Sequence, residues 1–154
     1  MQTSRVALSI GGGKQVSGFL QLPDSGWKDC ATGVILAHGA GNDMAHPLLV
    51  SLSRGLVEAG HVTLRFHFLY REQGRKAPDP QSTLVLAWQS AFQFLKGHPR
   101  FGTDAIVAAG KSMGGRVASQ MVADGLLPAS RLIFLGYPLH GPGRTDKLRD
   151  AHLY

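Results

Sequence analysis

A serine flanked by small residues lies in the second half of the chain. Gly110, Ser112 and Gly114 match the motif G-x-S-x-G within the segment GKSMG. In acyl-transfer enzymes such a serine occupies a sharp turn between a strand and a helix, where small residues two positions away avoid collisions in the strained backbone. Free N–H groups and the dipole at the start of a helix favour negative charge there. The spacing therefore indicates that Ser112 is a nucleophile.

The attacked carbonyl oxygen becomes negatively charged during acyl transfer, and two N–H donors must stabilise it. Met113, directly after the serine, would supply one donor. The other would come from the loop HGAG, with Ala40 as the expected donor, because Gly39 and Gly41 let the backbone come close. His38 begins this loop, and we expect its side chain to hydrogen-bond nearby backbone and shape the loop rather than transfer protons.

Two other ligand motifs are incomplete. Residues 110–112 (GKS) match the end of a phosphate-loop motif, but Ala105 takes the place of its first glycine and a predicted strand replaces the loop. Residues 39–41 (GAG) match the start of a dinucleotide-binding motif, but Met44 is too large for the third small position. We therefore expect neither site. Lys111 is expected to be an exposed residue of the serine turn that could favour acidic substrates.

A serine nucleophile requires a base to remove its proton. His140 follows the predicted strand 131–136, which should lie beside the strand that leads to Ser112, so His140 is the best-placed downstream histidine. Asp146 or Asp150 would then orient its ring. The alternative is that His140 only lines the substrate pocket.

Apolar segments predict the strands that position these residues. Four segments are apolar without alternation, as is typical of a parallel sheet covered on both faces. They span residues 33–39, 61–66, 105–110 and 131–136. RVALSI and VSGFLQL flank the turn residues GGGKQ and predict an antiparallel hairpin at the N-terminus. The HGAG loop and the serine turn follow strand ends, and ligands bind at this edge of such sheets.

Helical periodicity separates the strands. Helices are predicted for residues 47–59 and 80–96 and for the segment after Ser112. In the first helix the stripe expected to face the sheet consists of Leu48, Leu52 and Leu56. This alternation predicts an α/β fold with a doubly wound, mostly parallel sheet and the hairpin at its antiparallel edge, in a single domain over residues 1–154.

Composition excludes several classes of protein and site. The net charge is +6, but the sixteen Lys and Arg are spread along the chain without interleaved aromatic residues, so we expect no nucleic-acid partner. No apolar run reaches membrane-spanning length and no signal peptide is recognisable, so we expect no membrane association and a cytoplasmic protein.

Cys30 is the single cysteine, which rules out an internal disulfide. The other histidines lack ligand spacing, so we expect no metal and no other cofactor.

The sequence resembles the α/β-hydrolase superfamily, and within it the small lid-less serine hydrolases similar to dienelactone hydrolase, including a branch with testis-expressed and chromatin-complex-associated relatives. The similar stretches are GVILAHGAGNDMAHPLL, GHVTLRFHF, GKSMGGRVASQM and LIFLGYPLHGPGRTDKLRD. The resemblance implies a serine hydrolase that cleaves ester or related acyl bonds of a small-molecule substrate. It also implies that Ser112 is the nucleophile and that Ala40 and Met113 form the oxyanion hole.

The resemblance also implies a triad acid and histidine that follow two further strands. After Ser112 the chain has room for one predicted helix and one predicted strand, so we expect it to stop before the last strands of the fold. Segment 131–136, apolar on both faces, would then be an exposed edge that pairs in a homodimer or with a completing second piece. The alternative function is a non-catalytic binding or scaffold module that keeps the fold.

Overall fold

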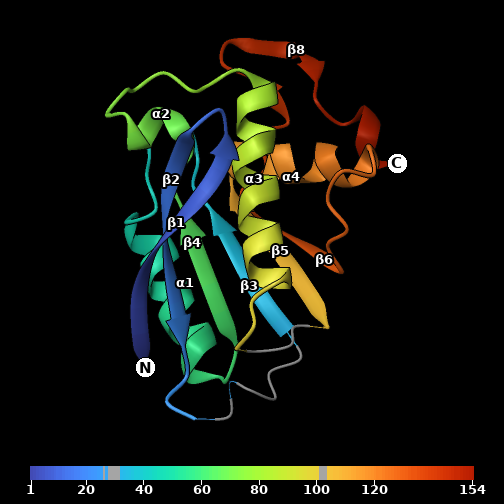
Figure 1. Cartoon of the computed structure of the whole chain (residues 1–154). Coiled ribbons are helices and arrows are strands. Elements are labelled where there is room, and N and C mark those ends of the chain that lie inside the picture. The colour runs from blue at the N-terminus through green and yellow to red at the C-terminus, as the bar shows by residue number, and fades with distance from the viewer. Residues whose placement is uncertain (26, 28–31, 101–103) are drawn as a thin grey trace.

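A six-stranded mixed sheet forms the centre of the computed structural model, which describes residues 1–25, 27, 32–100 and 104–154 (Figure 1). Cys30 lies outside the described residues. The strand order is β1-β2-β4-β3-β5-β6. The strands are β1 (Gln2–Gly11), β2 (Lys14–Leu22), β3 (Thr32–Ala37), β4 (Val62–Phe66), β5 (Ala105–Lys111) and β6 (Arg131–Leu135).

The sheet combines an antiparallel edge with a parallel core. β1 and β2 form a hairpin, and β2 pairs antiparallel with β4, with Gly18 opposite Phe66. β3 pairs parallel with both β4 and β5, and β5 pairs parallel with β6. The predicted α/β fold, with a mostly parallel sheet and an N-terminal hairpin at its edge, is therefore confirmed.

Helices cover both faces of this sheet because its inner strands are apolar on both sides. In β3, Val34 and Leu36 belong to the cluster under α1 (Pro47–Glu58), while Ile35 and Ala37 belong to the cluster on the opposite face. That second cluster is completed by α3 (Gln81–Lys96) and α4 (Met113–Ala123), and Figure 1 shows α3 crossing in front of the sheet.

The predicted inner stripe of α1 is confirmed in part, because Leu52 and Leu56 are partly buried and pack against the cluster beneath the helix. The buried positions are Leu49, Ser53 and Val57, whereas Leu48 is exposed. Ser53 is buried because its hydroxyl group hydrogen-bonds Gln21 of β2 and Thr63 of β4 beneath the helix. The inner face of α1 therefore includes a polar residue, Ser53, beside two leucines of the predicted stripe.

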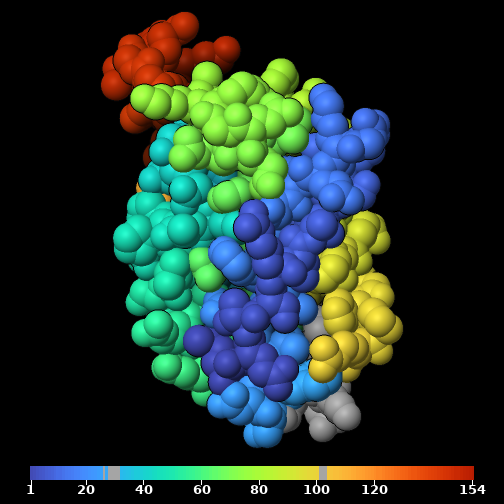
Figure 2. All heavy atoms as spheres, turned by 60° about the vertical axis from the view of Figure 1, so that its left-hand side comes forward, coloured from blue at the N-terminus to red at the C-terminus, as the bar shows by residue number. Residues whose placement is uncertain are grey.

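Shorter elements follow the longer ones. α2 (Leu69–Glu72) follows β4, and a two-stranded hairpin of β7 (His140–Gly141) and β8 (Arg144–Leu148) follows β6 and precedes a 3₁₀ turn, Ala151–Leu153. β8 is exposed along its whole length, and the C-terminal residues project beyond the body of the molecule in Figure 2. Within the described ranges, every helix is too short or too polar to span a lipid bilayer.

Candidate active site

Ser112 lies at the turn that joins β5 to α4. Its backbone has φ 48° and ψ −113°, and it is the one non-glycine residue with positive φ in the described part of the chain. Side chains rarely adopt this region, and holding one there costs on the order of 1–3 kcal/mol. Surrounding contacts must therefore stabilise the turn.

Glycines make those contacts possible because backbone packs directly against backbone. A Cβ atom at Gly110 would lie 2.1 Å from the nitrogen of Gly115, and one at Gly114 would lie 2.6 Å from the carbonyl oxygen of His38. Any larger residue would separate the start of α4 from β5 or from the end of β3. The spacing G-x-S-x-G thus has a steric cause in this fold.

Hydrogen bonds fix the ends of the turn. The N–H of Ser112 donates to the carbonyl oxygens of Leu135 (3.3 Å) and Gly136 (3.0 Å), at the end of β6. The carbonyl oxygen of Ser112 accepts from the N–H of Arg116 (3.0 Å), which begins the bonding pattern of α4. Ser112 is therefore bound to the edge strand as well as to its own helix.

The loop of residues 38–41 lies against Ser112. A Cβ atom at Gly39 would be 3.4 Å from the Cβ of Ser112. Within the described ranges, no acceptor bonds the N–H groups of Ala40 or Met113. Both residues line the same cavity as Ser112. Two N–H groups without an acceptor in the described ranges thus belong to residues that line the same cavity as the serine.

His38 holds this loop in place from the interior. Its Nε2 accepts from the N–H of Phe68 (3.1 Å), so the proton is on Nδ1, which donates to the carbonyl oxygen of Gly39 (2.9 Å). The Tyr70 hydroxyl donates to the same oxygen (3.3 Å). Burial lowers the pKa of His38 to about 4, because the charged ring would lose its hydration. His38 is therefore neutral at physiological pH and shapes the loop.

A cavity of about 540 Å³ opens beside Ser112. The polar side chains that line it are those of Ser112, Asp79, Gln81, Arg116, His140 and Arg149. Asp79 is already engaged: its carboxylate accepts from the N–H of Tyr70 (2.9 Å) and pairs with Arg75 (2.8 Å). The charged groups of the wall that have no ion pair with a described residue are therefore Arg116 and Arg149.

His140 shares the cavity with Ser112 but lacks an orienting acid. It lies on β7, where it pairs with Leu148 of β8, and it is exposed; within the described residues its side chain forms no hydrogen bond or ion pair. Asp146 instead contacts Arg144 (3.4 Å), and Asp150 accepts from the Tyr154 hydroxyl (3.3 Å). The structure thus brings His140 to the cavity without completing a triad around it.

The cavity wall differs in part from the sequence-based set of site residues. Lys111, at the end of β5, does not line the cavity, and neither do Gly39 and Gly41. Arg116 and Arg149 were missed. Arg116 could have been found from its spacing, because a residue four positions after Ser112 lies one helical turn above it.

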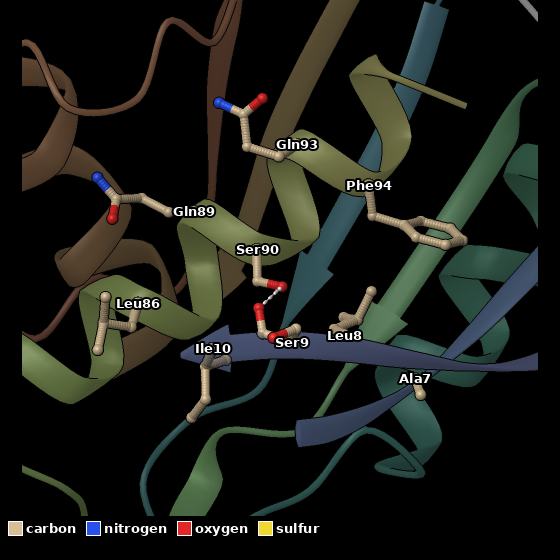
Figure 3. A pocket seen from close by; sticks show the side chains of 9 residues that line it. All are labelled: Ala7, Leu8, Ser9, Ile10, Leu86, Gln89, Ser90, Gln93 and Phe94. Carbon is tan, nitrogen blue, oxygen red and sulfur yellow. Dashed lines mark hydrogen bonds between the residues drawn. The ribbon is translucent and has the colours of Figure 1, made fainter. Parts of the chain in front are cut away.

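A second hollow of about 460 Å³ lies between β1 and α3 and shares no lining residue with the Ser112 cavity (Figure 3). Its lining side chains are uncharged, and the Ser90 hydroxyl already donates to the carbonyl oxygen of Ser9 (2.6 Å). Among the described residues, no group of histidine, cysteine and acidic side chains is arranged to hold a metal. Ser112 therefore marks the candidate site.

Solved hydrolase structures share this fold at low sequence identity. A dienelactone hydrolase from Anabaena variabilis is 22% identical, with 88% of this chain and 63% of that chain covered and a TM-score of 0.73. An alpha-beta serine hydrolase homologue from Coxiella burnetii is 22% identical, with coverages of 93% and 67% and a TM-score of 0.73. A lid-less serine hydrolase from Xanthomonas campestris is 21% identical, with coverages of 94% and 66% and a TM-score of 0.73. The chain thus spans about two thirds of the length of these proteins.

A family profile described as an alpha/beta hydrolase domain matches residues 30–154, which include β3 to β8 and the whole candidate site. The superfamily expected from the sequence is therefore confirmed, and this chain belongs to the alpha/beta hydrolase domain family.

Proposed function

We propose that this chain carries the nucleophile and oxyanion hole of a serine hydrolase that cleaves ester or related acyl bonds in small molecules. The observation that carries the proposal is the backbone of Ser112, which is held in a strained conformation beside a cavity that also contains Ala40 and Met113. Strain of this kind persists only where surrounding structure maintains it, and it is concentrated at functional sites.

In the proposed reaction the Ser112 Oγ attacks the carbonyl carbon of a bound ester. The carbonyl oxygen becomes an oxyanion that accepts hydrogen bonds from the N–H groups of Ala40 and Met113. The start of α4 adds the positive end of the helix dipole at the same place. The ester C–O bond then breaks, the leaving oxygen takes up the proton lost by Ser112 and departs as the alcohol, and water hydrolyses the acyl-serine to release the acid and restore the hydroxyl group.

The proton of the Ser112 hydroxyl group requires an acceptor. His140, the histidine that lines the cavity, has two possible roles. His140 either takes this proton or lines the pocket while another base acts. Substitution separates them, because loss of a general base slows acylation by about 10²–10⁴-fold. A pocket-lining residue would change the Michaelis constant instead.

Covalent labelling by a fluorophosphonate probe tests the nucleophile. We expect one label per chain, located at Ser112 by peptide mass spectrometry and lost in Ser112→Ala. Ser51→Ala is the matched control, because Ser51 is an exposed serine on α1, and it should be labelled like the wild type. A folded wild-type protein that takes up no label would overturn the proposal.

The second candidate function is a non-catalytic binding or scaffold module. The observation that favours it is that the described residues supply no hydrogen-bonded base for the Ser112 hydroxyl. This alternative predicts that Ser112→Ala binds the natural ligand as well as the wild type does, and that neither form is labelled by the probe.

A further inference from the structure

Two guanidinium groups line the Ser112 cavity without an acid to neutralise them. They belong to Arg116 and Arg149. Asp79 is the one acidic residue in the described wall, and its two carboxylate oxygens are occupied by Tyr70 and Arg75. The cavity therefore has positive charge that the described residues do not balance.

Arg116 lies on α4 one turn after Ser112. One terminal nitrogen donates to the side-chain oxygen of Gln120 (3.1 Å), but its Nε is buried and has no hydrogen-bond acceptor in the described structure. Burial, and next the charge of Arg149, lower the pKa of Arg116. A cation in this environment gains from an anion that approaches through the cavity, because the anion would offset both the desolvation and the repulsion.

Arg149 approaches the cavity from the hairpin of β7 and β8. Its backbone is held on both sides: its N–H donates to the carbonyl oxygen of Leu139 (2.6 Å), and its carbonyl oxygen accepts from the Tyr137 hydroxyl (3.0 Å). The guanidinium packs on Gly141, where a Cβ atom would lie 2.9 Å from Nη2. No ion pair with a described residue occupies this group.

Resting on the proposed hydrolase function, we propose that the cavity selects ester substrates that carry a free carboxylate, with Arg116 and Arg149 as the residues that bind it. Guanidinium groups suit this role because they remain charged and donate paired hydrogen bonds to the two oxygens of a carboxylate. The two arginines reach the cavity from different elements, one from α4 and one from the C-terminal hairpin, so a bound carboxylate would bridge them.

The test compares two p-nitrophenyl esters with acyl chains of equal length, the hemiglutarate and the pentanoate. We expect the wild type to prefer the hemiglutarate in kcat/KM by at least about tenfold, mainly through KM, because each charge-assisted hydrogen bond to the carboxylate adds affinity. Arg116→Gln and Arg149→Gln should each lower this preference by about 10-fold or more.

Lys147→Gln is the matched control because Lys147 is an exposed cation on β8 that does not line the cavity. It should leave both the rate and the preference unchanged. Equal kcat/KM for the two esters in the wild type, or a loss of preference in Lys147→Gln as large as in the arginine variants, would overturn the carboxylate site.

Glutarate binding can be measured without turnover, so it tests the carboxylate site independently of hydrolysis. By isothermal titration calorimetry the wild type should bind glutarate but not pentanamide, and Arg149→Gln should weaken glutarate binding at least about tenfold. Absence of glutarate binding sinks the carboxylate site even if Ser112 is labelled by the fluorophosphonate. Glutarate binding without any labelling retains the site and rejects the hydrolase.

Discussion

The neutral ring of His38 connects two loops through opposite nitrogens, and its protonation would break one of these bonds. Nε2 accepts from Phe68, so a proton added there removes the acceptor and places a charge in a fully buried site. The folded-state pKa of about 4 lies below the ordinary value of 6.5. Between these values the unfolded chain binds a proton that the folded protein does not bind, so stability present above pH 6.5 is lost as the pH falls towards 4.

We therefore expect His38→Gln to remove this pH dependence, because glutamine does not titrate and its side-chain oxygen can still accept from the Phe68 N–H. Urea unfolding between pH 7.5 and pH 4.5 provides the measurement. The stability advantage of the wild type should shrink by about 2.5 kcal/mol between pH 7.5 and pH 4.5. A difference between the two proteins that stays constant across this range would contradict the assignment.

Among single residues, the sequence predicted which ones lie together where their placement depends on neighbours along the chain. Ser112, Met113 and Ala40 border one cavity, as the motif and the loop HGAG suggested. Arg149 could not be predicted, because its place depends on how the hairpin of β7 and β8 folds back over the end of the sheet. The Gly-Pro-Gly segment at 141–143 signals a turn, but a turn does not reveal its direction.

The shape of the turn between β5 and α4 depends on direct contacts between backbone atoms of Gly110 and Gly115. We expect Gly110→Ala to destabilise the fold by more than about 3 kcal/mol, because the added methyl group would collide with backbone that has no free space to move. Gly55→Ala is the comparison: it lies in α1 with nothing within 4 Å of the added Cβ, and should stabilise by up to about 1 kcal/mol.

Thermal and urea unfolding of the two variants provide the measurement. Similar stabilities for Gly110→Ala and Gly55→Ala would mean that α4 can separate from β5 at little cost, which contradicts the packing of this turn.

Most elements were predictable because apolar runs and helical periods are local signals. Segments 61–66 and 131–136 correspond to β4 and β6 within one residue at each end. The inner face of α1 was predictable only in part, because its buried row also contains Ser53, whose burial depends on partners in two distant strands. Short elements such as α2 were missed because four residues carry no period.

For the molecule as a whole, the exposed border of the sheet at β6 is the feature with the largest consequence. Within the described residues no strand follows β6 in the sheet, and Ile133 and Phe134 are 45% and 39% exposed. Unpaired backbone groups beside apolar side chains favour pairing with another strand. The homodimer or completed sheet expected from the sequence remains a prediction, as do the single domain and the absence of a nucleic-acid partner.

We expect the chain alone to self-associate through β6, and Ile133→Lys to restore a monomer, because a charge on an edge strand opposes pairing. Size-exclusion chromatography with light scattering gives the mass. Leu126→Lys, at a site just as exposed (46%) but beyond the end of α4, should behave like the wild type. A monomeric wild type at high concentration would count against pairing at this border.

The amide of Ser112 donates to the carbonyl oxygens of Leu135, the last residue of β6, and of Gly136, which follows it. A strand that pairs with β6 would therefore contact the same backbone that positions the Ser112 hydroxyl group. The reactivity of Ser112 would then depend on strand pairing at β6. Dilution, which separates paired chains, would lower that reactivity without any change of side chain.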